Sequence, residues 1–318
     1  MDQPEDLGGP ALATTALWEL SKRLDATPSD PWIFFRPSWR WRWRSWAEVA
    51  DQMARGVVVL RRAAESAPQE IESGAFADRR DPDALVTSLT LRAAGFRPRP
   101  VDVEGNRPAA GSHPAAHLPA RTLWVRGASG ETSDPVAASP SPDPSAGLEE
   151  VVLPAVRSRF ETAPLESPDL PKGPNLDEPV PVSVGKLVAG LRASVAEPSK
   201  RAARPILCAG PDLSSATFQA LLVSTLASDA AWVLEADPDI FPAAASWARP
   251  TALVATPRQA GEVLDELGRS RRWRRLRQLW LLSSGASEDD ASTIRTRCAE
   301  LGVVAEPLPS GLTESLAA

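Results

Sequence analysis

Short apolar runs alternate with segments of helical period from residue 181 to the end of this sequence. Phe218, Leu222 and Leu226, for example, recur at the spacing that places side chains on one face of a helix. Strands that alternate with helices form parallel sheets with the helices packed on the sheet faces. The pattern therefore predicts an α/β fold.

Residues 181–318 contain the clearest candidates for both kinds of element. The expected helices are Lys186–Ala196, Ala216–Leu226, Ile240–Ala248, Arg258–Arg269 and Glu288–Leu301. The expected strands are Pro205–Gly210, Ala231–Glu235, Arg249–Pro257, Leu276–Ala286 and Gly302–Ala305.

The front of the chain carries further helix signals. Ser45 is a candidate N-cap, and Glu48 three residues later completes a capping box, so a helix is expected to continue through Asp51–Ala64. A second aliphatic helix is expected at Pro82–Ala94, and a proline-containing strand within Gly95–Val103. These elements predict a first α/β lobe.

In the second half of the chain, three short segments place small, polar or proline residues next to apolar runs. Arg249–Pro257 ends at a proline before a long helix, Ser283–Ala286 reads Ser-Ser-Gly-Ala, and Gly311–Glu314 reads Gly-Leu-Thr-Glu. With the elements of the front half, these segments resemble the adenylate-forming (AMP-binding) superfamily and its acyl-CoA synthetases. The resemblance implies two lobes with mainly parallel sheets flanked by helices, like the N-terminal part of an acyl-CoA synthetase.

The same resemblance implies a ligand site. Residues that would contact ATP or AMP are Gly311, Thr313, Ser284, Gly285 and Lys172. Glu314 would coordinate Mg²⁺, and no catalytic residue is assigned. The competing interpretation is that Thr313 and Glu314 form only a solvated chain end.

The segment that corresponds to the family's phosphate-binding loop departs strongly from its pattern. In residues 160–174, only Pro171-Lys172-Gly173 matches the family's Pro-Lys-Gly. Prolines donate no backbone N–H, and Glu161, Glu166 and Asp169 repel phosphate. The family's ribose-binding Asp, hinge Arg and lid Lys would follow Gly311–Glu314, where this sequence has only four more residues.

These departures lead to three functional hypotheses. The first is a truncated, non-catalytic relative, a pseudoenzyme that retains an acyl-substrate or protein-partner surface. The second is a working AMP-forming acid–CoA ligase, or half of one completed by another polypeptide. The third is an interaction or membrane-surface module that uses the Arg/Trp ribbon, residues 39–46.

The Arg/Trp ribbon alternates aromatic and basic side chains. As a strand of period two, it would place two sets on opposite faces: Trp39, Trp41 and Trp43, and Arg40, Arg42 and Arg44. Such a strand can bind an anionic surface through charge and stacking. The simpler interpretation, which we favour, is a hairpin whose tryptophans pack inward while its arginines face water.

Composition excludes several classes of protein. Hydrophobic residues make up 43% and charged residues 24%, as in a globular domain, and the net charge of −6 argues against a nucleic-acid partner. No transmembrane segment or signal peptide is expected, so the expected location is the cytoplasm. The richness in Ala, Arg and Pro suggests a bacterial gene. Cys208 and Cys298 are expected to be buried free thiols, and no metal site is expected at His113 and His117.

The proline clusters predict the domain organisation. Residues 1–128 form the expected front α/β lobe, which includes the Arg/Trp hairpin. Residues 129–180 form a Pro-rich linker with the degenerate loop, and residues 181–318 form the second α/β lobe.

Overall fold

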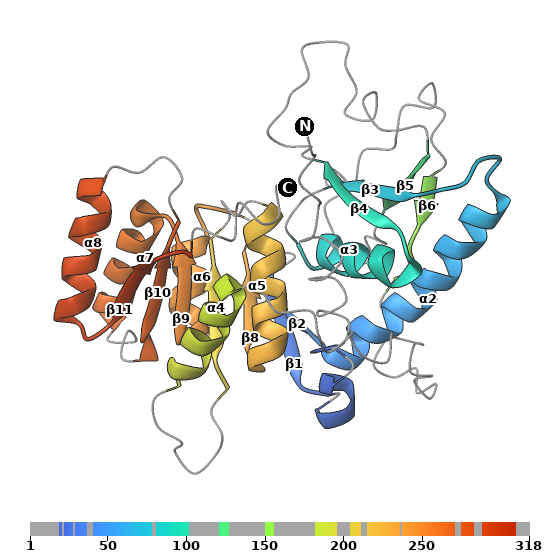
Figure 1. Ribbon diagram of the computed structural model, residues 1–318. Coiled ribbons are helices and arrows are strands. Elements are labelled where there is room, and N and C mark those ends of the chain that lie inside the picture. The colour runs from blue at the N-terminus through green and yellow to red at the C-terminus, as the bar shows by residue number, and fades with distance from the viewer. Residues whose placement is uncertain are drawn as a thin grey trace. The chain divides into compact units, whose positions relative to one another are not determined.

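The computed structural model forms two compact units (Figure 1). Unit 1 comprises Met1–Glu19, Pro31–Phe35 and Gly173–Ala318, and unit 2 comprises Leu20–Asp30 and Arg36–Lys172. The structure describes residues 19–20, 22–27, 29–36, 41–77, 81–101, 121–126, 150–155, 182–195, 204–210, 215–235, 237–270, 275–282 and 288–309.

Unit 1 is built on a parallel sheet whose strands lie in the order β11-β10-β9-β7-β8-β1. The strands are β1 (Pro31–Phe35), β7 (Ile206–Ala209), β8 (Ala231–Leu234), β9 (Ala252–Ala255), β10 (Gln278–Leu281) and β11 (Val304–Pro307). Every residue of β8, β9 and β10 is buried, which explains why these strands read as continuous apolar runs.

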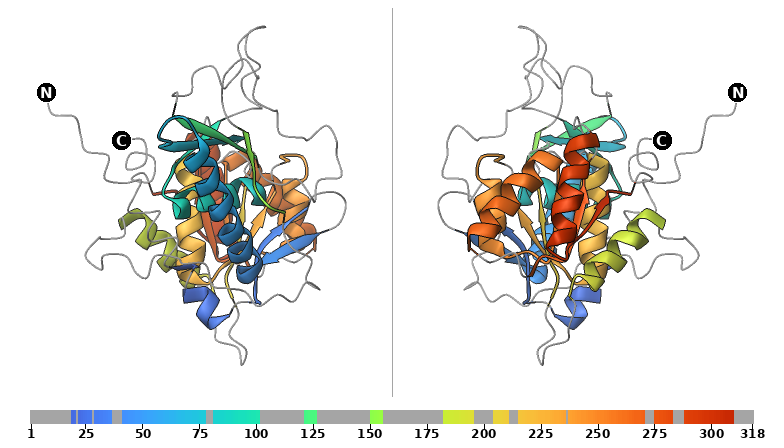
Figure 2. Two further views of the ribbon diagram at one scale, coloured as in Figure 1. Left: turned by 90° about the vertical axis from the view of Figure 1, so that its right-hand side faces the viewer. Right: turned by 90° about the vertical axis from the view of Figure 1, so that its left-hand side faces the viewer.

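Helices cover both faces of this sheet (Figure 2). They are α4 (Val182–Ala193), α5 (Ser215–Ser228), α6 (Phe241–Ala248), α7 (Pro257–Ser270) and α8 (Glu288–Glu300). Trp232 of β8 packs on Phe218 of α5, whereas Phe34 of β1, paired with Val233, contacts Trp247 of α6. Successive strand residues face opposite sides, so α5 and α6 lie on opposite faces of the sheet.

Unit 2 has a second parallel sheet, in the order β4-β3-β5-β6. Its strands are β3 (Ser73–Ala77), β4 (Arg97–Val101), β5 (Thr122–Arg126) and β6 (Glu150–Val152). The short strand β2 (Arg42–Ser45) precedes α2 (Trp46–Ser66), and α3 (Pro82–Ala94) connects β3 to β4. Leu60 of α2 and Leu91 of α3 share one apolar cluster with Leu123, Val125 and Val151 of the sheet.

Local sequence signals determine where the unit 2 helices begin and end. Ser45 and Glu48 form the expected capping box at the start of α2. The Asp81 carboxylate accepts from the Ala84 N–H at 2.7 Å ahead of α3, and Gly95, with a φ of 93°, ends it in the left-handed conformation that glycine tolerates.

The α/β fold class predicted from the sequence is confirmed. Each helix and strand expected at Pro82–Ala94 and beyond has a counterpart, although several strands are shorter than expected. Strands β1, β3, β5 and β6 were not expected from the sequence. Within the described ranges, no helix has the length and apolar character that a membrane span requires.

Candidate functional site

All the residues that the resemblance assigns to the ligand site lie outside the described residues: Lys172, Ser284, Gly285, Gly311, Thr313 and Glu314. The 160–174 segment, His113 and His117 also lie outside them. One described range ends at Leu282, just before Ser284 and Gly285, and another ends at Pro309, just before Gly311. The roles of these residues therefore stay predictions.

Both of these described ranges end at the carboxyl edge of the unit 1 sheet. Leu282 follows β10 and Leu308 follows β11, and the two strands are parallel neighbours. In open α/β sheets, ligands bind outside the carboxyl ends of the strands. This edge is therefore the candidate functional site, and its described residues can be analysed directly.

Backbone donors at this edge are committed to the sheet. The Gly210 N–H donates to the Val254 carbonyl at 2.8 Å, the Leu282 N–H to Ala255 at 2.9 Å, and the Leu308 N–H to Leu281 at 2.9 Å. A phosphate cradle needs backbone N–H groups that point at the ligand. These three groups are not available for that role.

The turn between β9 and α7 uses its donors in the same way. The Thr256 N–H donates to Gln259 Oε1 at 3.0 Å, and the Gln259 N–H donates to Thr256 Oγ1 at 3.3 Å. This reciprocal cap satisfies two donors at the start of α7. Gln259 also limits Gly210, because a Cβ there would lie 2.6 Å from Oε1 of the glutamine.

A carboxylate follows β8 at this edge. The Asp237 N–H donates to Glu235 Oε1 at 3.1 Å. Burial, and secondarily the charge of Glu235, raises the pKa of the Cys208 thiol.

The cysteines are buried and free, as the sequence predicts. Burial raises the pKa of Cys298 to about 11, so its thiol stays protonated at neutral pH. Among the described residues, no group of three or more His, Cys, Asp or Glu side chains is arranged to hold a metal ion.

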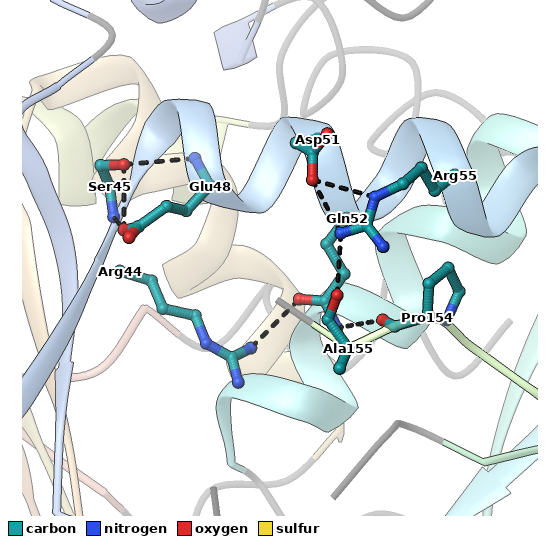
Figure 3. Close-up of polar contacts among 8 residues, drawn as sticks. All are labelled: Arg44, Ser45, Glu48, Asp51, Gln52, Arg55, Pro154 and Ala155. Carbon is teal, nitrogen blue, oxygen red and sulfur yellow. Dashed lines mark hydrogen bonds and ion pairs between the residues drawn. The ribbon is translucent and has the colours of Figure 1, made fainter. Parts of the chain in front are cut away.

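Unit 2 contains a polar network at the start of α2, of which Figure 3 draws Arg44, Gln52 and Pro154. Arg44 ion-pairs with Asp83 of α3, with 2.7 Å between Nη2 and Oδ1, and donates to Gln52 Oε1 at 3.4 Å. Gln52 Nε2 then donates to the Pro154 carbonyl at 3.1 Å. The network connects β2, α2, α3 and the chain beyond β6.

A second chain of contacts runs beside it (Figure 3). Arg55 donates to Asp51 Oδ2 through Nε at 3.0 Å and through Nη2 at 2.7 Å. The same Nη2 donates to the Ala155 carbonyl at 2.8 Å. Asp51 and Arg55 are four residues apart, so they lie on the same side of α2, and the helix geometry places the arginine next to the aspartate.

The network corrects our expectation for the Arg/Trp ribbon. Arg42 is exposed as expected, but Arg44 is only 3% exposed and bonded to Asp83. The expectation that all the arginines face water is wrong for Arg44, because a carboxylate 39 residues away compensates its buried charge. Trp41 and Trp43 are partly buried, and Trp39 and Arg40 lie outside the described residues.

The contacts of Gln52 and Arg55 were not expected from the sequence either. A signal for Gln52 was present, because it lies within the buried stripe of α2 between Val49 and Gly56. A polar side chain in an apolar stripe indicates a specific partner. The carbonyls that these two side chains contact, those of Pro154 and Ala155, follow β6, which was not expected from the sequence.

Comparison with known proteins identifies the fold. No protein-family model and no curated protein sequence matches the chain. Among solved structures, it is similar to the nonribosomal peptide synthetase FmoA3 in its AMPPNP-bound form, with 17% identity over 95% of this chain and a TM-score of 0.59. It is also similar to a long-chain-fatty-acid–CoA ligase from Archaeoglobus fulgidus (12% identity over 99%, TM-score 0.57) and to the Mycobacterium tuberculosis fatty acyl CoA synthetase (11% over 93%, TM-score 0.61).

The chain spans 31% of the FmoA3 chain, 69% of the A. fulgidus ligase and 59% of the M. tuberculosis synthetase. At sequence identities of 17%, 12% and 11%, the similarity to these structures shows a shared fold and nothing beyond it. The chain shares its fold with the corresponding part of these synthetases and of the ligase, as the resemblance in its sequence predicts.

Proposed function

We propose that this chain does not catalyse adenylation by itself and that it retains a role in binding an acyl substrate or a protein partner. The observation that supports the proposal is the composition of residues 160–174. Where the family places a glycine-rich phosphate loop, this sequence has prolines and the acidic residues Glu161, Glu166 and Asp169. Acyl adenylation depends on charge neutralisation and in-line positioning around the phosphates of ATP, which this composition opposes.

The carboxyl edge of the unit 1 sheet supports the same proposal. The backbone N–H groups of Gly210, Thr256 and Leu282 are bonded within the protein. If ATP or AMP with Mg²⁺ binds, Lys172, Thr313 and Glu314 would have to supply the contacts.

The alternative is a working AMP-forming acid–CoA ligase, or part of one. The fold favours it, because the structural neighbours include a fatty-acid–CoA ligase and a fatty acyl CoA synthetase. The chain spans 69% and 59% of these two proteins. In the version completed in trans, a second polypeptide would supply the part that this chain does not span.

Two measurements on the purified 318-residue chain separate these functions. Calorimetric titration with ATP–Mg²⁺ and with AMP measures nucleotide binding, and pyrophosphate exchange over a panel of fatty and aryl acids measures adenylation. We expect no exchange with any acid.

A Lys172→Met variant is the matched control for exchange. Exchange that disappears in this variant would contradict the proposal and establish a ligase, because a contaminating enzyme would be unaffected. Exchange that appears only after a second polypeptide with the family's ribose-binding Asp and lid Lys is added would establish the ligase completed in trans.

A further inference from the structure

Strand β6 is a short strand at one end of the unit 2 sheet. It has three residues, Glu150–Val152, and pairs on one side with β5. Its apolar contribution consists of Val151 and the following Leu153, whose N–H donates to the Arg126 carbonyl at 2.8 Å. Strands in globular proteins usually have about 3–10 residues, most often about five or six, so β6 is at the short end of this range.

Helix α2 holds the chain immediately beyond β6. Gln52 donates to the Pro154 carbonyl at 3.1 Å, and Arg55 donates to the Ala155 carbonyl at 2.8 Å. Gln52 and Arg55 are three residues apart, so they lie on one face of the helix. The two side chains therefore bind two consecutive carbonyls.

Both donors are held in place before they reach these carbonyls. Asp51 binds two nitrogens of Arg55, and Arg44 binds the amide oxygen of Gln52, which leaves the amide nitrogen oriented toward Pro154. Gln52 is also 2% exposed. A donor that is already ordered loses less conformational entropy when its hydrogen bond forms.

We propose that Gln52 and Arg55 form a clamp that fixes the carboxyl end of β6. The clamp fixes the backbone at Pro154 and Ala155, ahead of residues 160–174, the segment that corresponds to the family's phosphate loop. Both residues are positioning residues, and any effect on ligand binding rests on the proposed function above. The fixing of β6 is independent of it.

Three variants of the 318-residue chain test the clamp. Gln52→Glu keeps an acceptor for Arg44 but cannot donate to Pro154, and Gln52→Met removes the donor without adding charge. Arg55→Met removes the donor to Ala155. Arg258→Met is the matched control, because Arg258 forms an i,i+4 ion pair with Glu262 on an exposed part of α7.

The readout is amide hydrogen exchange. We expect exchange at Val151 and Leu153 to become at least tenfold faster in each clamp variant, while Trp124 in β5 and the amides of α3 change less than twofold. The Arg258→Met control should leave Val151 and Leu153 unchanged.

Two results would overturn the clamp. Unchanged exchange at Val151 and Leu153 would show that β6 is held by its own pairing. Equal acceleration throughout unit 2 would show that Gln52 and Arg55 only stabilise the core. Calorimetry with AMP adds a ligand readout: if the wild type binds AMP, weaker binding by the clamp variants supports a link to the ligand, and equal binding excludes it.

Discussion

At the scale of the residue, Arg44 is a buried cation with two side-chain partners in unit 2. It is 3% exposed, and its guanidinium is bound to Asp83 and Gln52. Removal of one partner from a buried ion pair leaves the other charge uncompensated. Because Asp83 keeps 20% of its side chain exposed, we expect Arg44→Met to destabilise unit 2 by about 2–3 kcal/mol. The slowest-exchanging amides of α3 and β5 measure this change.

Arg42 provides the control within the same strand. It is exposed, and Arg42→Met should change the free energy of unfolding by less than about 0.5 kcal/mol. Equal effects of the two substitutions would show that the Arg44–Asp83 pair contributes no more than a surface ion pair.

At the scale of the element, the capping box should stabilise α2. Ser45 Oγ accepts from the Glu48 N–H at 3.2 Å, and the Ser45 N–H donates to Glu48 Oε2 at 2.7 Å. We expect Ser45→Ala to cost about 1 kcal/mol, because a donor of the first turn loses its partner. Native-state amide exchange across α2 gives the value.

Ser66 is the matched control at the other end of α2. Its hydroxyl donates to the Arg62 carbonyl at an exposed position, so Ser66→Ala should change stability by only a few tenths of a kcal/mol. A loss for Ser66→Ala as large as that for Ser45→Ala would mean that the capping box has no special role.

Elements with local signals were predictable, and elements that depend on distant contacts were not. The bounds Pro82–Ala94 follow from a proline at the start and Gly95 after the end, both visible in the sequence. Strand β6 has no such signal, because its pairing to β5 and its contacts with Gln52 and Arg55 come from residues far away in the chain. The burial of Arg44 was missed for the same reason.

The candidate site was predictable only through resemblance. Short polar motifs such as Gly311–Glu314 have no period from which a position can be computed, and the six assigned residues lie outside the described ranges. Topology identifies the edge from which two of the segments continue, since β10 and β11 are parallel neighbours.

At the scale of the whole molecule, each unit contains a close contact between a helix glycine and a buried side chain. In unit 1, a Cβ on Gly190 of α4 would lie 2.6 Å from the ring of Trp280. In unit 2, a Cβ on Gly56 of α2 would lie 2.6 Å from Thr90 Cγ2. Trp280 is 2% exposed and Thr90 is fully buried, so neither side chain can move aside into solvent.

These two glycines test whether the units are independent in stability. Overpacking of a filled core typically costs about 1–3 kcal/mol, and we expect this loss for Gly190→Val in unit 1 and for Gly56→Val in unit 2. Amide exchange should accelerate in β9 and β10 for the first variant and in β3 and β5 for the second, with little effect on the other unit. Acceleration in both units by either substitution would show that they unfold together, because the two contacts share no residue. Each variant thereby serves as the control for the other.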